Sequence, residues 1–519
     1  MACRVLLACP VLAAAWLPIC MGALARAQPA DNASEAGRAA ADGRAAEAGR
    51  RYEGLGQRLR DRITANAVPL ADAGVKIVSV KTGEVILDNY AGKLLVPASN
   101  AKLAVTAAAL RLLGRDFCFE TRLHARGGLL PDGTLDGDLV VAGCGDPEIS
   151  GRHHEGDPCF LFRAWAKAMK EAGIRAVRGG IVCDASAFDG ETIHPSWPKN
   201  QLEQWYCAPV SALSLNDNCV DATVGPGRGP GSPASVSLSP PSTYAVVDNH
   251  CTTTAAKREH QFGFLGLAGL RPVTLRGKFW QQASPAVTSI PVADPPLYFG
   301  TVLKETLQAE GLSVGGKVAV SYDRVPLEKT DALLATHRTP LETAVQVANK
   351  QSQNFYAEQL LKALGFKASG KGTFATGAAA VKQFLAGVSQ GGSQCVPADG
   401  SGLSRDNRYS AAVLTDLLCW MARQPDGAVF AATLPAAGID GTLAERFPEE
   451  WCRGRILAKT GTLAGASSLS GYVNVPGDIL AFSMLMNSPK AGVWRMKLAQ
   501  DAILKEMLEF CRQLPAAGD

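Results

Sequence analysis

The sequence predicts an α/β protein of the α+β kind: an antiparallel sheet flanked by helices, with a long strand-rich insertion. Two β-hairpins support the sheet, one near each end of the chain. The first pairs residues 75–80 with 85–87 across a glycine turn, and the second pairs 469–475 with 479–486 across Pro-Gly-Asp. Between about 116 and 327, short apolar runs alternate with Gly, Pro, Asp and Asn clusters, which favours short strands.

Helical patterns supply the flanking layers. Residues 101–113 form an apolar run that starts after Ser99 and ends at Gly114, and two further helices are expected over 341–350 and 355–364. At the C-terminal end, apolar residues recur at spacings of three and four, as in an amphipathic helix: Met496, Ala499, Ile503, Met507, Phe510 and Leu514.

Length and charge exclude several classes of protein. A chain of 519 residues suggests about three domains, and 47% apolar residues can fill their cores. Lys and Arg number 52 against 48 Asp and Glu, so the net charge of +4 is too balanced for a nucleic-acid binder that relies on a basic field. After residue 30 no apolar run is long enough to span a bilayer, which argues against a polytopic membrane protein.

The N-terminus reads as an export signal. Arg4 precedes an apolar stretch over 5–24, and Ala25-Arg26-Ala27 is a small-residue cleavage pattern. We expect residues 1–27 to be a signal peptide cleaved near Ala27, with a periplasmic mature protein; an uncleaved anchor is the alternative. Residues 28–50 lack large apolar side chains and are expected to be a flexible linker.

Eleven cysteines follow the signal segment, and an oxidising compartment would allow them to pair. Their odd number leaves at least one without a disulfide. Cys207 and Cys219 flank one short segment, and we predict a disulfide between them. His153, His154 and Cys159 lie close in sequence, but their spacing fits no standard ligand pattern, so we expect no metal and no cofactor.

The first motif with catalytic chemistry is Ser99-Asn100-Ala101-Lys102. Residues three apart share one face of a helix, so Lys102 can reach back to the Ser99 hydroxyl. Burial or a second cation would lower the pKa of such a lysine and let it act as a base. Ser196-Trp197-Pro198-Lys199 has the same spacing, but Pro198 disfavours the helix and the lysine would not be held under its serine.

Two later motifs complete the set. Ser352-Gln353-Asn354 lies between two predicted helices, where a hydroxyl and a carboxamide can point into one cleft. Lys459-Thr460-Gly461-Thr462 precedes the second hairpin; its lysine offers a cation for a substrate carboxylate, and Gly461 would let a ligand approach the backbone. Lys81-Thr82-Gly83 is a look-alike that precedes the nucleophile and carries Glu84 beside it.

This order of motifs is the signature of penicillin-binding proteins and serine β-lactamases. The flanking sequence resembles the low-molecular-mass class C penicillin-binding proteins, the D-alanyl-D-alanine carboxypeptidase/endopeptidase family, over about residues 50–512. The resemblance is carried by VPASNAKLAVTAAAL (96–110), GDLVVAGCGDPEI (137–149), YCAPVSALSLNDN (206–218), ANKQSQNFYAEQLLKALG (348–365), ADGSGLSRDNRYS (398–410), LPAAGIDGTLAERF (434–447) and AKTGTLAGASSLSGYVN (458–474).

The resemblance implies a role for each motif. Ser99 would be the acylated nucleophile and Lys102 its base, with Ser352 and Asn354 relaying a proton and positioning the substrate. The strand of Lys459, Thr460, Gly461 and Thr462 would bind the substrate carboxylate, and the N–H groups of Ser99 and Thr462 would form the oxyanion hole. Substrate contacts from the insertion are less recognisable, with Asp184 and Asp189 as candidates.

The resemblance also implies a reaction and its partners. Ser99 would attack the D-Ala–D-Ala carbonyl of peptidoglycan stem peptides, release the terminal D-Ala and be freed by hydrolysis. The same site would open cross-links as an endopeptidase, and β-lactam antibiotics would acylate Ser99 as covalent inhibitors. Neither nucleic acid nor metal is expected, and the sequence does not define the oligomeric state.

Motif spacing places the insertion. Ser99 and Ser352 are 253 positions apart, which leaves about 200 residues outside a serine β-lactamase/transpeptidase-like catalytic domain. The resemblance implies that this domain covers 51–115 and 328–519 and carries two small inserted β-rich domains: domain II over 116–135 and 200–327, and domain III over 136–199. A serine β-lactamase, or a non-enzymatic peptidoglycan-binding protein on this scaffold, remains the alternative. The long insertion disfavours the former, and the intact motifs disfavour the latter.

Overall fold

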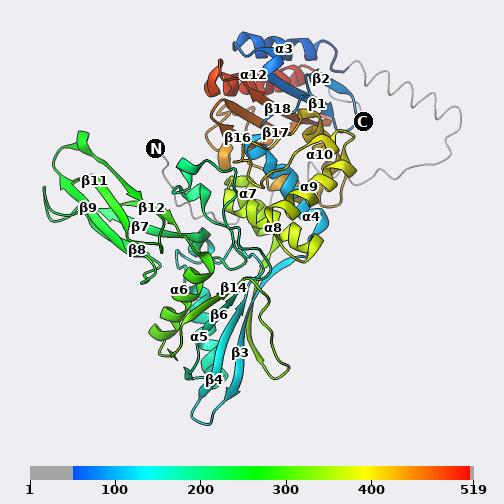
Figure 1. Ribbon diagram of the computed structural model, residues 1–519. Coiled ribbons are helices and arrows are strands. Elements are labelled where there is room, and N and C mark those ends of the chain that lie inside the picture. Colours follow the sequence, from blue (N-terminus) through cyan, green and yellow to red (C-terminus); the bar gives the residue numbers. More distant parts are fainter. Residues whose placement is uncertain (1–50, 515–519) are drawn as a thin grey trace. The chain divides into compact units, whose positions relative to one another are not determined.

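A computed structural model describes residues 51–514, which divide into two compact units (Figure 1). The first unit contains the chain up to Arg111, Val345–Ser352 and the chain from Val381 onward; the second contains Leu112–Ala344 and Gln353–Ala380. The expected signal peptide and linker lie outside the described residues. Within 51–514, no helix combines the length and apolar character needed to cross a lipid bilayer.

The first unit is built on a five-stranded antiparallel sheet in the order β16-β17-β18-β1-β2. Both predicted hairpins are confirmed, since β1 pairs with β2 and β17 with β18, the latter closing at Val475 opposite Asp478. The strands are β1 (Ala73–Ser79), β2 (Val85–Asn89), β16 (Ile456–Leu463), β17 (Ala466–Val475) and β18 (Asp478–Asn487).

Helices α3 (Leu55–Ala65) and α12 (Gly492–Arg512) cover one face of this sheet (Figure 1). Successive strand residues point to opposite faces, so alternate apolar side chains such as Phe482 and Met484 pack against the two helices. The predicted C-terminal amphipathic helix is confirmed. Its periodic residues Met496, Ala499, Ile503 and Met507 are fully buried.

The opposite face carries α10 (Ala411–Ala422), and polar contacts fix it there. Lys76 of β1 forms an ion pair with Asp416 at 2.7 Å, and the Tyr472 hydroxyl donates to the Leu418 carbonyl at 2.8 Å. The predicted helices at 101–113 and 341–350 are confirmed. The remaining helices are α4 (Ala101–Leu112), α7 (Leu341–Lys350), α9 (Phe374–Val388) and α11 (Gly427–Ala432), and the chain changes unit within α7 and α9.

The second unit centres on a seven-stranded sheet with two helices packed against it. Its path is β13-β5-β4-β3-β15, and β6 joins β4 and carries β14. The elements are β3 (Cys118–Leu129), β4 (Thr134–Ala142), α5 (Phe160–Glu171), β5 (Ala176–Val177), β6 (Ile181–Asp184), α6 (Pro295–Ala309), β13 (Ser313–Val314), β14 (Val318–Ser321) and β15 (Ala332–Pro340).

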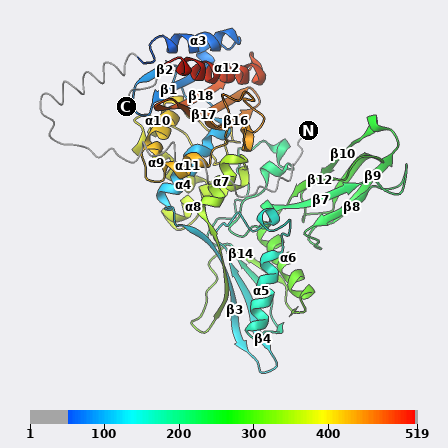
Figure 2. The ribbon, with the colours of Figure 1, turned by 180° about the vertical axis from the view of Figure 1, so that it is seen from behind.

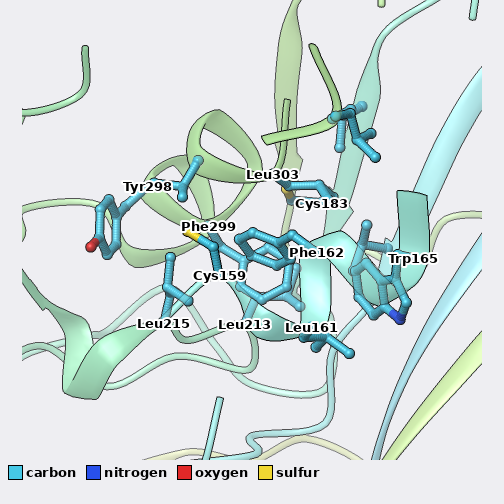
Figure 3. Close-up of a cluster of buried hydrophobic side chains, with 14 of the residues drawn as sticks. Cys159, Leu161, Phe162, Trp165, Cys183, Leu213, Leu215, Tyr298, Phe299 and Leu303 are labelled. Atoms are coloured by element: carbon cyan, nitrogen blue, oxygen red, sulfur yellow. The ribbon is translucent and has the colours of Figure 1, made fainter. Parts of the chain in front are cut away.

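Figure 3 shows the core between these helices, where Phe162 of α5 meets Phe299 of α6 edge to face, with ring centroids 4.9 Å apart. The strand-rich prediction for the insertion missed both helices. Their signals were present: Phe162, Trp165 and Met169 recur at helical spacing, and Asp294 caps α6 through the Leu297 N–H at 3.1 Å.

Two three-stranded sheets, β12-β7-β8 and β10-β11-β9, make up a separate lobe of the second unit, which we call the β-lobe (residues 219–292; Figure 2). Its strands are β7 (Cys219–Gly225), β8 (Ser235–Ser239), β9 (Val247–Thr254), β10 (Gln261–Leu265), β11 (Val273–Trp280) and β12 (Ala286–Pro291). The boundary that we expected between residues 135 and 136 falls inside the β3–β4 hairpin. Backbone pairing therefore divides the insertion into the seven-stranded sheet and the β-lobe.

The predicted helix at 355–364 is confirmed as α8 (Asn354–Ser369), which belongs to the second unit. Its Lys362 is fully buried and forms an ion pair with Asp189 at 2.6 Å. Cys207 and Cys219, predicted to form a disulfide, are also buried in this unit, at the end of a 3₁₀ turn and the start of β7. Their pairing stays a prediction.

Candidate active site

Ser99 lies in a single 3₁₀ turn, Ala98–Asn100, directly before α4. The segment leading to it is held by side chains of the sheet. The Asn487 amide accepts from the Val96 N–H at 2.8 Å and donates to its carbonyl at 3.1 Å, and the Ser468 hydroxyl donates to the Pro97 carbonyl at 2.6 Å. The strands therefore fix where the helix begins and where Ser99 stands.

Lys102 lies under this serine, as its spacing predicts. Its Nζ is 3.1 Å from the Ser99 Oγ and donates to the Ser401 carbonyl at 2.7 Å. The lysine is fully buried, whereas Ser99 is half-buried. One turn of helix thus gives the hydroxyl a nitrogen neighbour that is shielded from water.

Lys459 connects the Lys-Thr-Gly-Thr motif to the Ser-Gln-Asn motif through a hydrogen bond to Ser352. It is fully buried on β16, and its Nζ donates to the Ser352 Oγ at 2.7 Å and to the Thr460 carbonyl at 2.9 Å. Burial, reinforced by the positive charge of Lys102, places the pKa of Lys459 well below its ordinary value. Two lysines that influence each other electrostatically are therefore enclosed beside two serine hydroxyls.

Ser352 follows α7 in a left-handed backbone conformation, with φ +58°, which costs energy for a residue with a Cβ. A buried chain of hydrogen bonds fixes the end of α7 that leads to it. The Asn349 amide donates to the Thr106 hydroxyl of α4 at 3.2 Å and to the Thr433 hydroxyl at 2.9 Å. The surrounding contacts thus hold a strained residue with its hydroxyl facing Lys459.

Asn100, for which no role was predicted from the sequence, connects the 3₁₀ turn of Ser99 (the nucleophile turn, Ala98–Asn100) to β16. Its buried amide donates to the Lys459 carbonyl at 2.8 Å. The structure shows a packing reason for Gly461, in addition to the ligand approach that its motif predicts. A Cβ at this position would lie 2.8 Å from the Ser99 nitrogen and 2.2 Å from the Ser468 Oγ, so the glycine is required for β16 to pack against the nucleophile turn.

The loop that follows residue 398 holds Lys102 from the other side. Asp399 is fully buried and accepts from the Gly402 N–H at 2.8 Å, the Ser404 N–H at 2.6 Å and the Asn407 amide at 2.7 Å. This network presents the Ser401 carbonyl to Lys102. No role was predicted for these residues from the sequence. The sequence did hold a signal, because an aspartate shortly before a Ser-Gly-x-Ser run is typical of a loop whose backbone N–H groups bond to a side chain.

Asn354, Thr462 and Thr460 are the remaining predicted site residues. Asn354 is the first residue of α8 in the second unit, and its amide donates to the Tyr206 carbonyl at 2.9 Å. Thr462 is exposed on β16, opposite Ser467 of β17. The Thr460 hydroxyl donates to the hydroxyl of Thr442 at 2.7 Å, a neighbour that the sequence did not indicate.

The two aspartates considered in the insertion differ. Asp184 is buried, and its carboxylate accepts from the N–H groups of Ser186 at 2.9 Å and Val325 at 3.0 Å, which is a structural use. Asp189 keeps a partly exposed carboxylate beside buried Lys362.

Both look-alike motifs lie in other surroundings. The Ser196 Oγ is 2.9 Å from the His194 Nδ1, while Lys199 is exposed in a short 3₁₀ turn. Lys81 is exposed in the β1–β2 turn, where its Nζ donates to the Gly477 carbonyl at 3.3 Å.

Comparison with known proteins identifies the family of this chain. The model of the D-Ala-D-Ala carboxypeptidase 3 (S13) family matches residues 55–507. A D-alanyl-D-alanine carboxypeptidase of Actinomadura sp. (strain R39) is 33% identical over 453 residues, which cover 85% of this chain and 82% of the relative. D-alanyl-D-alanine carboxypeptidase DacB of Haemophilus influenzae is 27% identical over 81% of this chain and 86% of its own length.

Comparison with solved structures finds a protein of similar fold. The crystal structure of penicillin binding protein 4 from Haemophilus influenzae superposes with a TM-score of 0.74 at 25% identity, covering 87% of this chain and 99% of that one. With a family match over most of its length, this chain belongs to the D-Ala-D-Ala carboxypeptidase 3 (S13) family.

Proposed function

We propose that this protein is a serine-type D-Ala-D-Ala carboxypeptidase that acts on peptidoglycan stem peptides through an acyl-enzyme on Ser99. The observation that carries the assignment is the convergence of Ser99, Lys102, Ser352 and Lys459 in one enclosed cluster. Family membership supports the same activity.

In the acylation step, the Ser99 Oγ attacks the carbonyl carbon of the penultimate D-Ala, and Lys102 accepts the hydroxyl proton. The N–H groups of Ser99 and Thr462 stabilise the developing oxyanion. As the peptide bond breaks, a proton passes through Ser352 to the departing amine of the terminal D-Ala. That proton is the one Lys102 took from Ser99, so Lys102 is neutral again when the amine departs. Water then attacks the ester while Lys102 accepts a proton from it, and Lys102 returns this proton to the Ser99 Oγ as the ester bond breaks.

Lys459 recognises the terminal carboxylate of the substrate. Burial and Lys102 disfavour its charged form in the free protein, but an incoming carboxylate favours that form because opposite charges attract. Thr460 and Asn354 complete substrate binding, the latter through its carboxamide.

The same chemistry extends to two related acyl donors. An amide bond from D-Ala to the side-chain amine of a neighbouring stem peptide presents the same carbonyl, which gives endopeptidase activity on cross-links. A β-lactam presents a strained amide to Ser99 and leaves a stable acyl-enzyme. These substrates fit a periplasmic location after signal cleavage near Ala27.

Substitution of the nucleophile tests the proposal. Ser99→Ala should abolish labelling by fluorescent penicillin and release of D-Ala from an acyl-D-Ala-D-Ala peptide, because no other group there can form the ester. Lys102→Ala should nearly abolish both. Ser196→Ala and Lys81→Ala are the matched controls and should label like the wild type.

Stoichiometric labelling of Ser99→Ala, or failure of a folded Ser196→Ala, would contradict the assignment. Nitrocefin separates the peptidase from a β-lactamase, since a peptidase should turn it over slowly or not at all.

A further inference from the structure

The β-lobe carries most of the excess positive charge of the protein. Six of its residues are Lys or Arg and three are Asp or Glu, so residues 219–292 hold a net +3 of the +4 of the whole chain. The basic residues are Arg228, Lys257, Arg258, Arg271, Arg276 and Lys278. None of them belongs to a catalytic motif.

Strand alternation places two of these charges, Arg276 and Lys278, on the same face of the β10-β11-β9 sheet. Leu275 and Phe279 of β11 point into the small core of the lobe, so Arg276 and Lys278 between and beside them point to the opposite face. The register sets Arg276 between Gly263 of β10 and His250 of β9, and all three are exposed.

Two carboxylates, Asp248 and Glu259, share this face. The Asp248 carboxylate lies 2.8 Å from the His250 Nε2, and Glu259 forms an ion pair with Lys278 at 2.9 Å. Lys257 lies with its Nζ 5.2 Å from the centre of the Trp280 ring, on the same face, and is exposed. Arg258 is exposed and acts electrostatically on Glu259. Four cations therefore outnumber the two carboxylates of this face: Lys257, Arg258, Arg276 and Lys278.

We propose that this outer face of the β-lobe binds the stem-peptide carboxylates of peptidoglycan, outside the catalytic site. The inference rests on the proposed function, which makes that polymer the substrate. Stem peptides carry free carboxylates at regular intervals along the polymer, and an exposed row of cations complements them. Holding the polymer at a second site would raise the local concentration of cleavable stems without any new catalytic group.

The experiment measures co-sedimentation of full-length protein with purified peptidoglycan sacculi at low salt. All proteins carry Ser99→Ala, so that binding is separated from cleavage. Lys257→Glu/Arg276→Glu should bind about tenfold more weakly, since each exposed charge contact contributes modestly. The matched control is Lys167→Glu/Lys367→Glu, which reverses two exposed lysines of α5 and α8 and should bind like the parent.

Equal loss in both double variants would overturn the proposal, because only net charge would matter. Unchanged binding of Lys257→Glu/Arg276→Glu to sacculi would also overturn it. A third contrary result would be that this variant loses binding to anionic lipid vesicles but keeps its binding to sacculi. If the reversal variant melts early, Lys257→Gln/Arg276→Gln replaces it, with an expected weakening of about threefold. In the background with Ser99 intact, D-Ala release from a soluble peptide should be the same in all variants; its absence from the wild type would refute the proposed function instead.

Discussion

In the proposed function, Lys459 has to meet two opposing requirements. Recognition of a carboxylate requires an ammonium, yet the group is fully buried and lies within the electrostatic influence of Lys102, both of which oppose its charge. A buried charge without a full complement of partners destabilises the folded state. The residue is therefore expected to favour function at the expense of stability.

This conflict predicts a pH-dependent stability. The pKa of Lys459 is lowered on folding, so unfolding takes up a proton at pH values between the folded pKa and the ordinary lysine pKa, and stability rises with pH across that window. Lys459→Met removes the titrating group and keeps the bulk. Its Tm should exceed that of the wild type near neutral pH, and the difference should shrink as the pH approaches about 10.

Thermal melts of the wild type and Lys459→Met across this pH range make the comparison, with D-Ala release expected to be lost in the variant. Lys81→Met, at the exposed look-alike, is the control and should show no such trend. A gap in Tm that does not change with pH would exclude the proposed cost of burying Lys459.

At the scale of elements, the loop after residue 398 and the start of α4 form one unit. Gly402 has φ +82°, and a Cβ there would lie 1.8 Å from the Ala98 carbonyl oxygen, so the loop and the nucleophile turn are in direct backbone contact. The Asp399 carboxylate sets the loop, and the loop sets the Ser401 carbonyl that holds Lys102. The position of Lys102, the proposed base, thus depends on Asp399, a residue outside the three motifs.

Asp399→Asn tests this dependence. An amide offers one acceptor oxygen and turns an N–H₂ toward donors, so at least one buried hydrogen bond is lost, at about 1.5–3 kcal/mol of unfolding free energy. We expect a lower urea midpoint and slower acylation by fluorescent penicillin. Asp406→Asn is the matched control, because Asp406 is exposed in the same loop and should change neither quantity.

At the scale of the whole molecule, the chain closes its catalytic unit from segments far apart in sequence. Residues near 73–89 pair with 478–487, so the sheet is complete only when both ends of the chain have been made. The long insertion adds a second core and the β-lobe without interrupting that sheet.

The predicted Cys207–Cys219 disulfide belongs to this scale, because it would fix the segment between the seven-stranded sheet and the β-lobe. Closing a loop of this length should stabilise the protein by about 3 kcal/mol in the chain-entropy model. A non-reducing peptide map of exported protein should show the two cysteines in one linked peptide. Recovery of both thiols in the free form would contradict the pairing.

Local sequence patterns predicted most elements of the catalytic unit. The period-3.6 pattern at residues 496–514 reflects one face of α12 packing against the core, whereas the continuous apolar run at 101–113 reflects a helix that is buried on all sides over Ala101–Leu110. The hairpins at 75–87 and 469–486 were readable from strand-forming runs separated by turn residues. The motif order Ser99, Ser352, Lys459 was likewise readable, because serine and lysine chemistry is specific when three short motifs occur together.

Other features depended on contacts between distant segments and could not be read from sequence. The need for Gly461 arises from the backbone of Ser99, and the role of Asn100 from the Lys459 carbonyl, both more than 350 positions away. The insertion divides into the seven-stranded sheet and the β-lobe because β3 pairs with β4. The frequency of Gly and Pro in the sequence does not show which strands pair. Sequence determines which residues can carry the chemistry, because that is a property of side chains; tertiary structure decides which of them share an enclosed space, because that depends on how distant backbones pack.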